Sequence, residues 1–391
     1  MDRLHVVKRF FLIFLLSVTV CFQPCAARVS VLTCSPGEEA YSLFGHTGLR
    51  YCDSDRGIDV VFNYGYFSFN APNFIWRFIL GETDYMVGAV TYDIFVREYM
   101  ERGSAVTEQV LSLTPEQEQA LFALLLENCG PENCVYRYNY FYNNCTTKIR
   151  DKVFSVNQPS FEGERDGVTF RDELSRMLAS HPWYSFGINL LLGSDVDCCA
   201  SRSDLQFIPG NFMDDLGNAW TIDSVGKKIP FVKETETSVA GVECLCKRNN
   251  FTPFNASLLL LLFTLIVMLC EVRRRTVFWW YDVVLMLLQG LSGALLLFMA
   301  LFSEHPAVDS NWLILLLNPV ALLLIPVLVY QAVKRVPVTV AWVQVFFIAA
   351  FLLTAVLSLQ VYPTPIYFCA LALLARSLFH IYKEKICELG L

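Results

Sequence analysis

Beyond residue 254 the sequence consists of near-continuous apolar runs joined by short polar connectors. Each run approaches the roughly 20 residues that an α-helix needs to cross a bilayer. Because lipid offers the backbone no hydrogen-bond partners, runs of this length are expected to fold as helices. We therefore predict an all-α transmembrane helical bundle over residues 254–382. Its five spans are Phe254–Cys270, Val277–Phe302, Trp312–Val333, Val338–Leu359 and Ile366–Tyr382.

Basic residues in the connectors predict the orientation of this bundle. Residues 273–275 after the first run are all arginine, and the next connector on that side carries Lys334 and Arg335. The connectors on the other side, SEHPAVDSN and YPTP, contain neither lysine nor arginine. Because cytoplasmic loops are enriched in lysine and arginine, we expect residues 383–391 to form a cytoplasmic tail and the N-terminal domain to lie outside.

The N-terminus has the build of an export signal. A basic start precedes an apolar stretch from Phe10 to Phe22, which ends at the small residues Ala26 and Ala27. This pattern is typical of a secretory signal peptide over residues 1–27, cut after Ala27, and an uncleaved anchor helix is the alternative. Under either interpretation residues 28–250 are exported. The net charge of −7 argues against nucleic acid as a partner.

The exported part contains nine cysteines, an odd number. Export permits disulfides. Because nine is odd, at least one of these cysteines is free or forms a disulfide with another chain. Cys129 and Cys134 flank a Gly-Pro turn and could bridge locally, and Cys34 with Cys52 is a second candidate pair. The spacing has no matching histidine cluster, so we expect neither a zinc site nor a cofactor. The nine are Cys34, Cys52, Cys129, Cys134, Cys145, Cys198, Cys199, Cys244 and Cys246.

Cys145 is distinguished by its local sequence. A capping box at Thr114-Pro-Glu-Gln117 opens a helix, the following CVYRYNYFY predicts a strand, and NNCTTKIRDKVF predicts a second helix. Cys145 is thus expected at a strand-to-helix junction, in the first turn of that helix. Unpaired backbone N–H groups and the helix dipole there would stabilise a thiolate and an oxyanion.

A thiol nucleophile needs a base, and three histidines are expected on the exported side. His46 lies in the alternating stretch YSLFGHTGLRYC, which predicts a strand entered through glycine. His181 falls in the turn-like SHPWY, and His305 lies in a membrane connector. His46 is therefore the candidate base for Cys145.

The sequence after His46 predicts a β-hairpin. CDSDRG is a turn sequence, and IDVVFNYGYF predicts the second strand. A four-residue loop over residues 53–56 would pair Cys52 with Gly57 and place Asn63 directly opposite His46, on the same face. Asn63 would then orient the base, as in nucleophile–base–orienter sites. The alternative is that Asn63 only bonds a backbone group.

Two stretches are richer in aromatic and apolar residues than a small core requires: residues 71–81, APNFIWRFILG, and residues 182–193, PWYSFGINLLLG. We interpret each as a core helix; lining an acyl-chain groove or dipping into the outer leaflet is the alternative. Asn318, inside the third apolar run, is costly in lipid and predicts a buried polar contact. With Asn311, His305 and Glu304 it could bind lipid head groups, or it could serve helix packing.

The motifs FGHTGLR, FNYGYFSF and YNNCTTKIRD resemble the exported domain of the Lnb-type bacterial lipoprotein N-acyltransferases. The resemblance continues through FGINLLLGSDVD, FIPGNFMDDL and SEHPAVDSNWLILLLNP. It implies an α+β fold class: a permuted papain-like (NlpC/P60-, LRAT-like) exported domain, followed by the transmembrane bundle. It also implies location in the bacterial inner membrane, with the catalytic domain in the periplasm.

The resemblance further implies a reaction. Cys145 would take an acyl chain from a membrane phospholipid as a thioester, with His46 as base. The hairpin predicted above adds Asn63 as the candidate third catalytic residue. The acceptor would be the α-amino group of the S-diacylglyceryl cysteine of a diacylated lipoprotein. The predicted substrate-binding residues are Asn144, Tyr64, Tyr142, Trp76, His305 and Asn318.

Two other functions are compatible with the motifs. A periplasmic cell-wall peptidase or amidase could use the same cysteine and histidine, although such an enzyme seldom needs five membrane spans. A non-catalytic membrane scaffold with an inactive papain-like module would hold Cys145 in a disulfide or tolerate its replacement by serine.

Overall fold

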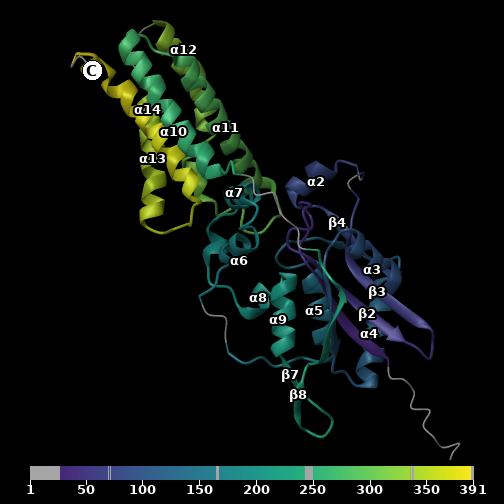
Figure 1. Cartoon of the computed structure of the whole chain (residues 1–391). Helices are drawn as coiled ribbons and strands as arrows, with labels where there is room; N and C mark the ends of the chain where they lie inside the picture. Colours follow the sequence, from purple (N-terminus) through teal and green to yellow (C-terminus); the bar gives the residue numbers. More distant parts are fainter. Residues whose placement is uncertain are drawn as a thin grey trace, which may run out of the picture.

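The computed structural model describes residues 27–68, 70, 72–163, 167–242, 250–334, 336 and 339–388, with side chains through residue 382. The predicted signal peptide lies outside the described residues except for Ala27, and so do Cys244, Cys246 and Arg335. Figure 1 shows a sheet-containing domain seated at one end of a long helical bundle. The predicted fold class, an α+β domain followed by a helical bundle, is confirmed.

A seven-stranded antiparallel sheet forms the centre of the N-terminal domain. Its strand order is β6-β4-β3-β2-β1-β5-β9, and β7 pairs with β8 in a separate hairpin. The strands are β1 (Arg28–Cys34), β2 (His46–Asp53), β3 (Ile58–Tyr66), β4 (Asp84–Thr91), β5 (Val106–Leu111), β6 (Val135–Arg137), β7 (Trp220–Ile222), β8 (Lys228–Pro230) and β9 (Val232–Val239).

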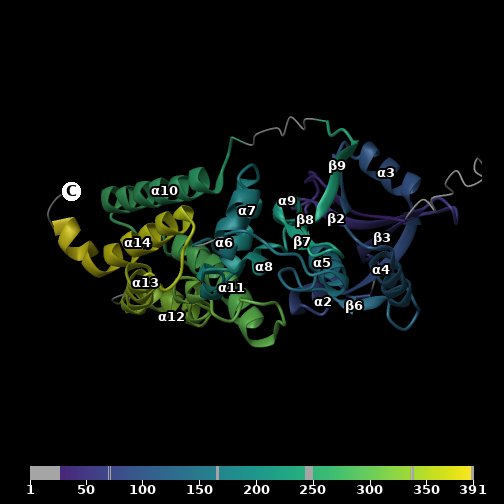
Figure 2. The ribbon, with the colours of Figure 1, turned by 90° about the horizontal axis from the view of Figure 1, so that it is seen from below.

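Helices cover both faces of this sheet. Figure 2 shows α3 (Tyr92–Glu101) on one side and α4 (Pro115–Asn128) and α5 (Cys145–Val156) on the other. The first side buries Phe95 against strand residues, and the second buries Leu121 and Ile149 together with Phe212 of α9 (Pro209–Asn218). Each such side chain contributes about 1.5–3 kcal/mol on burial. The sheet that carries β2 and β3 is therefore held rigidly between two cores.

The β2–β3 hairpin exists, but its predicted register is wrong by two residues. Cys52 pairs with Asp59, and the turn occupies residues 54–57. Gly57 has φ of +64°, and Asp53 Oδ1 accepts a hydrogen bond from the Arg56 amide. The turn thus uses the glycine, which adopts positive φ without strain, and the aspartate, which bonds the turn backbone.

The strand predicted for CVYRYNYFY is largely wrong. Only β6, residues 135–137, joins the sheet, and Asn139 then bridges to Asn143 in a tight loop. Asn139 Oδ1 accepts hydrogen bonds from the amides of Phe141 and Tyr142. A short polar side chain that bonds the following backbone competes with the strand ladder. The predicted helices on either side, α4 with its capping box at Thr114 and α5 beginning at Cys145, are confirmed.

The described cysteines are free thiols. Cys34 pairs with His46 in the β1–β2 ladder, whereas Cys52 pairs with Arg28 at the opposite end of the same two strands. A Cys34–Cys52 disulfide is therefore excluded, because bridged cysteines have Cα atoms within about 7 Å. Cys129 and Cys134 flank their turn as predicted, without a bond between them.

The bundle comprises α10 (Pro253–Arg274), α11 (Trp279–Phe302), α12 (Val320–Lys334), α13 (Val340–Val356) and α14 (Thr364–Glu388), with a short helix η2 (Trp312–Leu315) before α12. Among the described residues four segments are long and apolar enough to cross a membrane: Pro253–Arg274, Trp279–Phe302, Trp312–Lys334 and Thr364–Tyr382. The 17-residue α13 is shorter. At 1.5 Å per residue it reaches about 26 Å, somewhat less than the roughly 30 Å hydrocarbon core.

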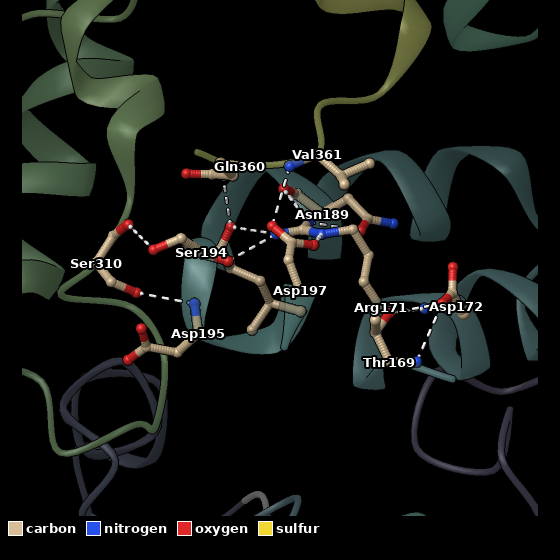
Figure 3. A network of polar contacts seen from close by, with 12 residues as sticks. Thr169, Arg171, Asp172, Asn189, Ser194, Asp195, Asp197, Ser310, Gln360 and Val361 are labelled. Carbon is tan, nitrogen blue, oxygen red and sulfur yellow. Dashed lines mark hydrogen bonds and ion pairs between the residues drawn. The ribbon is translucent and has the colours of Figure 1, made fainter. Parts of the chain in front are cut away.

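A polar network joins the domain to the bundle. Arg171 of α6 (Phe170–Met177) is buried and donates to Asn189, to Asp197 and to the Leu192 and Gly193 carbonyls. Asp197, at the end of η1 (Ser194–Asp197), accepts from the Val361 amide of the bundle. Figure 3 shows these contacts together with those between Ser194 and Ser310. The domain is therefore fixed to the bundle at this seam.

The two aromatic-rich stretches are not core helices, and that interpretation is wrong. Residues 74–80 form α2 (Phe74–Leu80), which contains no buried residue. Residues 182–191 form α7 (Pro182–Leu191), whose one buried residue is Asn189, and its Phe186, Leu190 and Leu191 pack partly against the bundle. Both helices lie where the domain meets the bundle: α7 packs these side chains against it, and α2 contacts α11 through Trp76 and Phe298.

Candidate active site

Cys145 is the first residue of α5, and Asn144 is its N-cap. Asn144 Oδ1 accepts hydrogen bonds from the amides of Thr146 and Thr147, both at 2.9 Å. Its Nδ2 donates to the carbonyls of Tyr140 and Phe207. These bonds occupy the hydrogen-bonding groups of a side chain that is itself buried. The predicted substrate-binding role of Asn144 is therefore corrected: it fixes the start of the helix that carries Cys145.

His46 begins β2, and its ring is bonded to Asn63. His46 Nε2 lies 2.6 Å from Asn63 Oδ1. Asn63 pairs with Gly48, so it stands diagonally to His46 and not directly opposite. A shift of two residues preserves the face of a strand, which is why the predicted contact forms despite the wrong register. Because an amide oxygen only accepts, Nε2 carries the proton, and the other ring nitrogen of neutral His46 is left to act as the base.

The electrostatics of this pair favour an ionised thiol. Burial opposes the charge on Cys145, but the charge of His46 and a hydrogen bond from it outweigh burial and lower the pKa of Cys145 to about 7. The Thr47 amide and the Thr146 hydroxyl add smaller contributions in the same direction. Burial likewise opposes a charge on His46, yet the nearby thiolate and the bond to Asn63 raise its pKa. At neutral pH the two groups thus approach a thiolate–imidazolium pair, the reactive form of a cysteine nucleophile.

Several residues that shape the site escaped the sequence prediction. The hydroxyls of Thr47 and Thr146 lie 3.0 Å apart and tie β2 directly to α5. The Tyr99 ring stacks on the His46 ring, with centroids 6.3 Å apart. The alternation of β2 places Thr47 on the face opposite to His46, toward α5, and this signal was present in the sequence. The Tyr99 contact joins residues 53 positions apart and gave no local signal.

Two glycines give the pair its close approach. Gly45 has φ of +82°, and a Cβ built there would lie 2.5 Å from the Cys34 carbonyl oxygen. Gly65 has φ of +114°, and a Cβ there would lie 3.6 Å from His46 Cε1 and 4.0 Å from Cys145 Cβ. Positive φ strains residues other than glycine. These positions therefore admit the backbone path that brings β2, β3 and the start of α5 together.

The predicted use of several helix amides as an oxyanion site needs correction. The amides of Thr146 and Thr147 already donate to Asn144, and the Lys148 amide donates to the Asn144 carbonyl. The amide of Cys145 itself is the first-turn N–H that these bonds leave unused. An oxyanion at Cys145 would therefore have this one backbone donor from α5, together with the helix dipole.

The other predicted substrate residues lie in three different places. Tyr64 is buried beneath the sheet and donates its hydroxyl to Asn128, so it faces the core. Tyr142 is exposed three residues before Cys145. Asn318 is buried in the bundle just before α12, where its Oδ1 accepts a hydrogen bond from the Ala321 amide in the first turn of that helix. Its predicted buried polar contact is confirmed, and neither Tyr64 nor Asn318 presents a free polar group to Cys145.

Trp76 and His305 come together at the junction of the domain and the bundle. Trp76 belongs to α2 and contacts Phe298 of α11, and His305 Nε2 lies 2.6 Å from the Phe78 carbonyl of α2. Glu304 pairs with Arg137, and Asn311 donates to the Leu190 carbonyl. Among the described residues, no cluster of three or more His, Cys, Asp or Glu side chains could hold a metal.

Comparisons with known families agree with this architecture. The Lnb N-terminal periplasmic domain matches residues 19–175, which include His46, Asn63 and Cys145. The Lnb transmembrane domain matches residues 246–386, which include helices α10 to α14. No curated protein and no solved structure matched the chain. Since it carries both domains of one family in order, the chain belongs to the Lnb family.

Proposed function

We propose that the protein transfers an acyl chain from a membrane phospholipid to the N-terminal amine of a diacylated lipoprotein, through a thioester on Cys145. The observation that carries this proposal is the Cys145–His46–Asn63 arrangement on a domain fixed to a membrane bundle. Both substrates are anchored in the bilayer, so an active site seated on membrane helices meets them where they reside.

In the first step the Cys145 thiolate attacks the ester carbonyl carbon of the phospholipid. An S–C bond forms, and the ester C–O bond breaks. The departing alkoxide takes its proton from the His46 imidazolium, leaving a lysophospholipid and an acyl-Cys145 thioester. Asn63, bonded to Nε2, keeps the His46 ring oriented through this transfer.

In the second step the neutral α-amine of the lipoprotein cysteine attacks the thioester carbonyl. A C–N bond forms and the C–S bond breaks, returning the sulfur as thiolate. His46 accepts the proton that the amine loses, which restores the starting ion pair. Because only the unprotonated amine attacks, transfer is expected to rise from mildly acid toward mildly alkaline pH.

The proposal includes a topology. Residues 28–250 form the periplasmic domain, and residues 254–382 form five transmembrane helices in the inner membrane, with a cytoplasmic C-terminus. The domain contacts the bundle at the loop after α11 and at the connector before α14. Lys334 and the arginines at 273–275 lie at the other helix ends, as expected for the cytoplasmic side.

Two alternatives use the same residues differently. A cell-wall peptidase or amidase would also need the cysteine–histidine pair, but it would gain nothing from a fixed seat on a bilayer. A scaffold would need no ionised thiol, whereas Cys145 is free and is paired with His46. The attachment to the bundle thus favours the acyltransferase over a peptidase, and the free Cys145 paired with His46 favours it over a scaffold.

A mass spectrum of the Cys145 peptide tests the proposal directly. Purified protein is incubated with phospholipid alone, and we expect a fatty-acyl mass on Cys145 that hydroxylamine removes and that the His46→Ala variant lacks. A lipopeptide acceptor should then discharge it. An unmodified Cys145 beside competent lipid, or a Cys145 linked to another cysteine, would refute the acyltransferase and favour the alternatives.

A further inference from the structure

Helix α2 exposes large apolar side chains that the domain does not use. It contains no buried residue, and Ile75, Trp76 and Phe78 are 75%, 54% and 46% exposed. An isolated helix of this length is marginal in water. Contiguous exposed apolar patches of this kind mark surfaces that meet another partner. We therefore expect a partner outside the domain to cover this patch.

The loop after α11 holds the C-terminal end of α2. The Ser303 hydroxyl donates to the Ile79 carbonyl and the Glu304 amide donates to the Leu80 carbonyl, each at 2.7 Å. His305 Nε2 lies 2.6 Å from the Phe78 carbonyl. The last carbonyls of a helix have no partners within it, so the bundle supplies them here. This second contact between the domain and the bundle, the second seam, holds α2 beside the C-terminal end of α11.

The exposed surface of α2 continues onto that of α11. The Trp76 ring lies 5.2 Å from the Phe298 ring of α11. Leu301 and Phe302, in the last turn of α11, are exposed as well. Apolar side chains exposed on a membrane helix face lipid, and tryptophan is enriched where hydrocarbon meets head groups. The same lipid layer therefore reaches α2.

We propose that α2 is inserted into the interface of the bilayer leaflet at this end of α11, with Ile75, Trp76 and Phe78 against phospholipid. The occupant of the patch is thus membrane lipid. Short amphipathic segments lie in such interfaces with their apolar side chains among the upper acyl chains. The placement of α2 follows from the contacts above and does not depend on the reaction.

A file of aromatic rings leads from α2 toward the nucleophile. Phe74 lies 5.8 Å from Phe67, Phe67 lies 4.9 Å from Tyr85, and Tyr85 lies 4.2 Å from Tyr138, measured between ring centroids. Burial, together with the negative charge of Cys145, raises the pKa of Tyr85 to about 12. Resting on the proposed function, α2 is then where the donor's acyl chain leaves the leaflet, and the file gives it an apolar path.

Photo-crosslinking tests the placement of α2 without requiring activity. Benzoylphenylalanine replaces Ile75 in the full chain, embedded in nanodiscs of phosphatidylethanolamine and phosphatidylglycerol. The control position is Val225, 89% exposed in the turn between β7 and β8. We expect phospholipid adducts on the peptide carrying residue 75 and none above background at 225. Adducts to a second polypeptide, or no lipid adduct at 75, would overturn the proposal.

A donor comparison tests the path. Acyl-Cys145 formation is measured for Ile75→Glu, Ile75→Leu and Val225→Glu, with bilayer phospholipid and with a short-chain soluble ester. We expect Ile75→Glu to lose about tenfold with the bilayer donor alone, and the other two variants to match the parent. Equal loss with both donors would show a structural role and refute the path. If the parent itself forms no acyl-Cys145, the proposed function fails, while the crosslinking result still decides where α2 lies.

Discussion

Cys145 and His46 stabilise each other's charged form, so replacing either residue should shift the pKa of the other. Both residues could be identified as candidates from the sequence, because a cysteine at a helix start and a histidine on an alternating strand are local features. A contact between His46 and Asn63 was also predicted, but for a directly opposed pair, whereas the structure makes it diagonally in a register two residues away. The stacking of Tyr99 on His46 depends on tertiary packing and had no local signal, whereas for the link between Thr47 and Thr146 the alternation of β2 indicated only the face of Thr47.

The pH dependence of Cys145 reactivity is the first prediction. The pKa of Cys145 is lowered to about 7, so alkylation by iodoacetamide should rise as pH passes through about 7, where thiolate replaces thiol. In His46→Ala the compensating positive charge is gone while burial remains, so the midpoint should move to higher pH. The readout is the alkylated fraction of the Cys145 peptide by mass spectrometry. The exposed Cys198 serves as an internal reference, and a midpoint that stays unchanged in His46→Ala would contradict the ion pair.

Asn63 should act by positioning His46. Asn63→Ala removes the acceptor of the Nε2–H bond, so acyl-Cys145 formation should fall by about 10–100-fold, by analogy with the loss of a partner that orients a metal-binding histidine. The raised pKa of His46 should fall as well, since that bond favours the charged ring. NMR titration of His46 distinguishes this from a merely structural defect. Asn133→Ala, on the exposed turn after α4, is the matched control.

Helices and strands were predictable to the extent that their signals are local. The Thr114 capping box and the start of α5 were correct because caps are encoded within four residues. The prediction of a strand over CVYRYNYFY failed because Asn139 Oδ1 accepts hydrogen bonds from the amides of Phe141 and Tyr142, and the ladder ends after Arg137. The core assignment of residues 71–81 failed because α2 is paired with a helix more than 200 residues away. Composition does not report such a partner.

The start of α5 gives an element-scale prediction. Asn144→Ala removes an N-cap and should destabilise the protein by about 1 kcal/mol or more, because the Tyr140 and Phe207 carbonyls also lose a buried donor. The freed first turn should fray, and the pKa of Cys145 should rise as its fixed surroundings loosen. Ser201→Ala removes the cap of the short α8 (Arg202–Leu205) and should destabilise without changing that pKa. Thermal unfolding and the alkylation profile check both, and equal profiles would refute the coupling.

The described residues form a domain and a helical bundle, as the hydropathy pattern predicts, but no local sequence feature indicates how the two are joined. The seams at Arg171 and at His305 join residues far apart in the chain. A further long-range cluster lies within the bundle. Arg376 of α14 bonds both Glu271 of α10 and Asp282 of α11, and His380 lies 3.0 Å from Asp282. All four side chains are buried.

Loss of Arg376 should be costly for the whole bundle. Arg376→Leu leaves two buried carboxylates without their cation, which should cost about 3–5 kcal/mol, as removal of one partner of a buried pair does. Lys334→Leu, an exposed basic residue at a helix end, should change stability little. Unfolding of both variants in matched detergent micelles provides the comparison. A destabilisation of Arg376→Leu no larger than that of Lys334→Leu would contradict the role of the cluster.

The two seams have a kinetic consequence. A domain bonded to its platform at both Val361 and the loop beyond Phe302 cannot travel to its substrates, so Cys145 stays at one height above one small area of membrane. Under the proposed function, donor and acceptor then arrive by lateral diffusion, in turn, as solutes of a two-dimensional fluid. Turnover should accordingly follow the mole fraction of each substrate within the bilayer and remain constant when the same proteoliposomes are diluted in buffer.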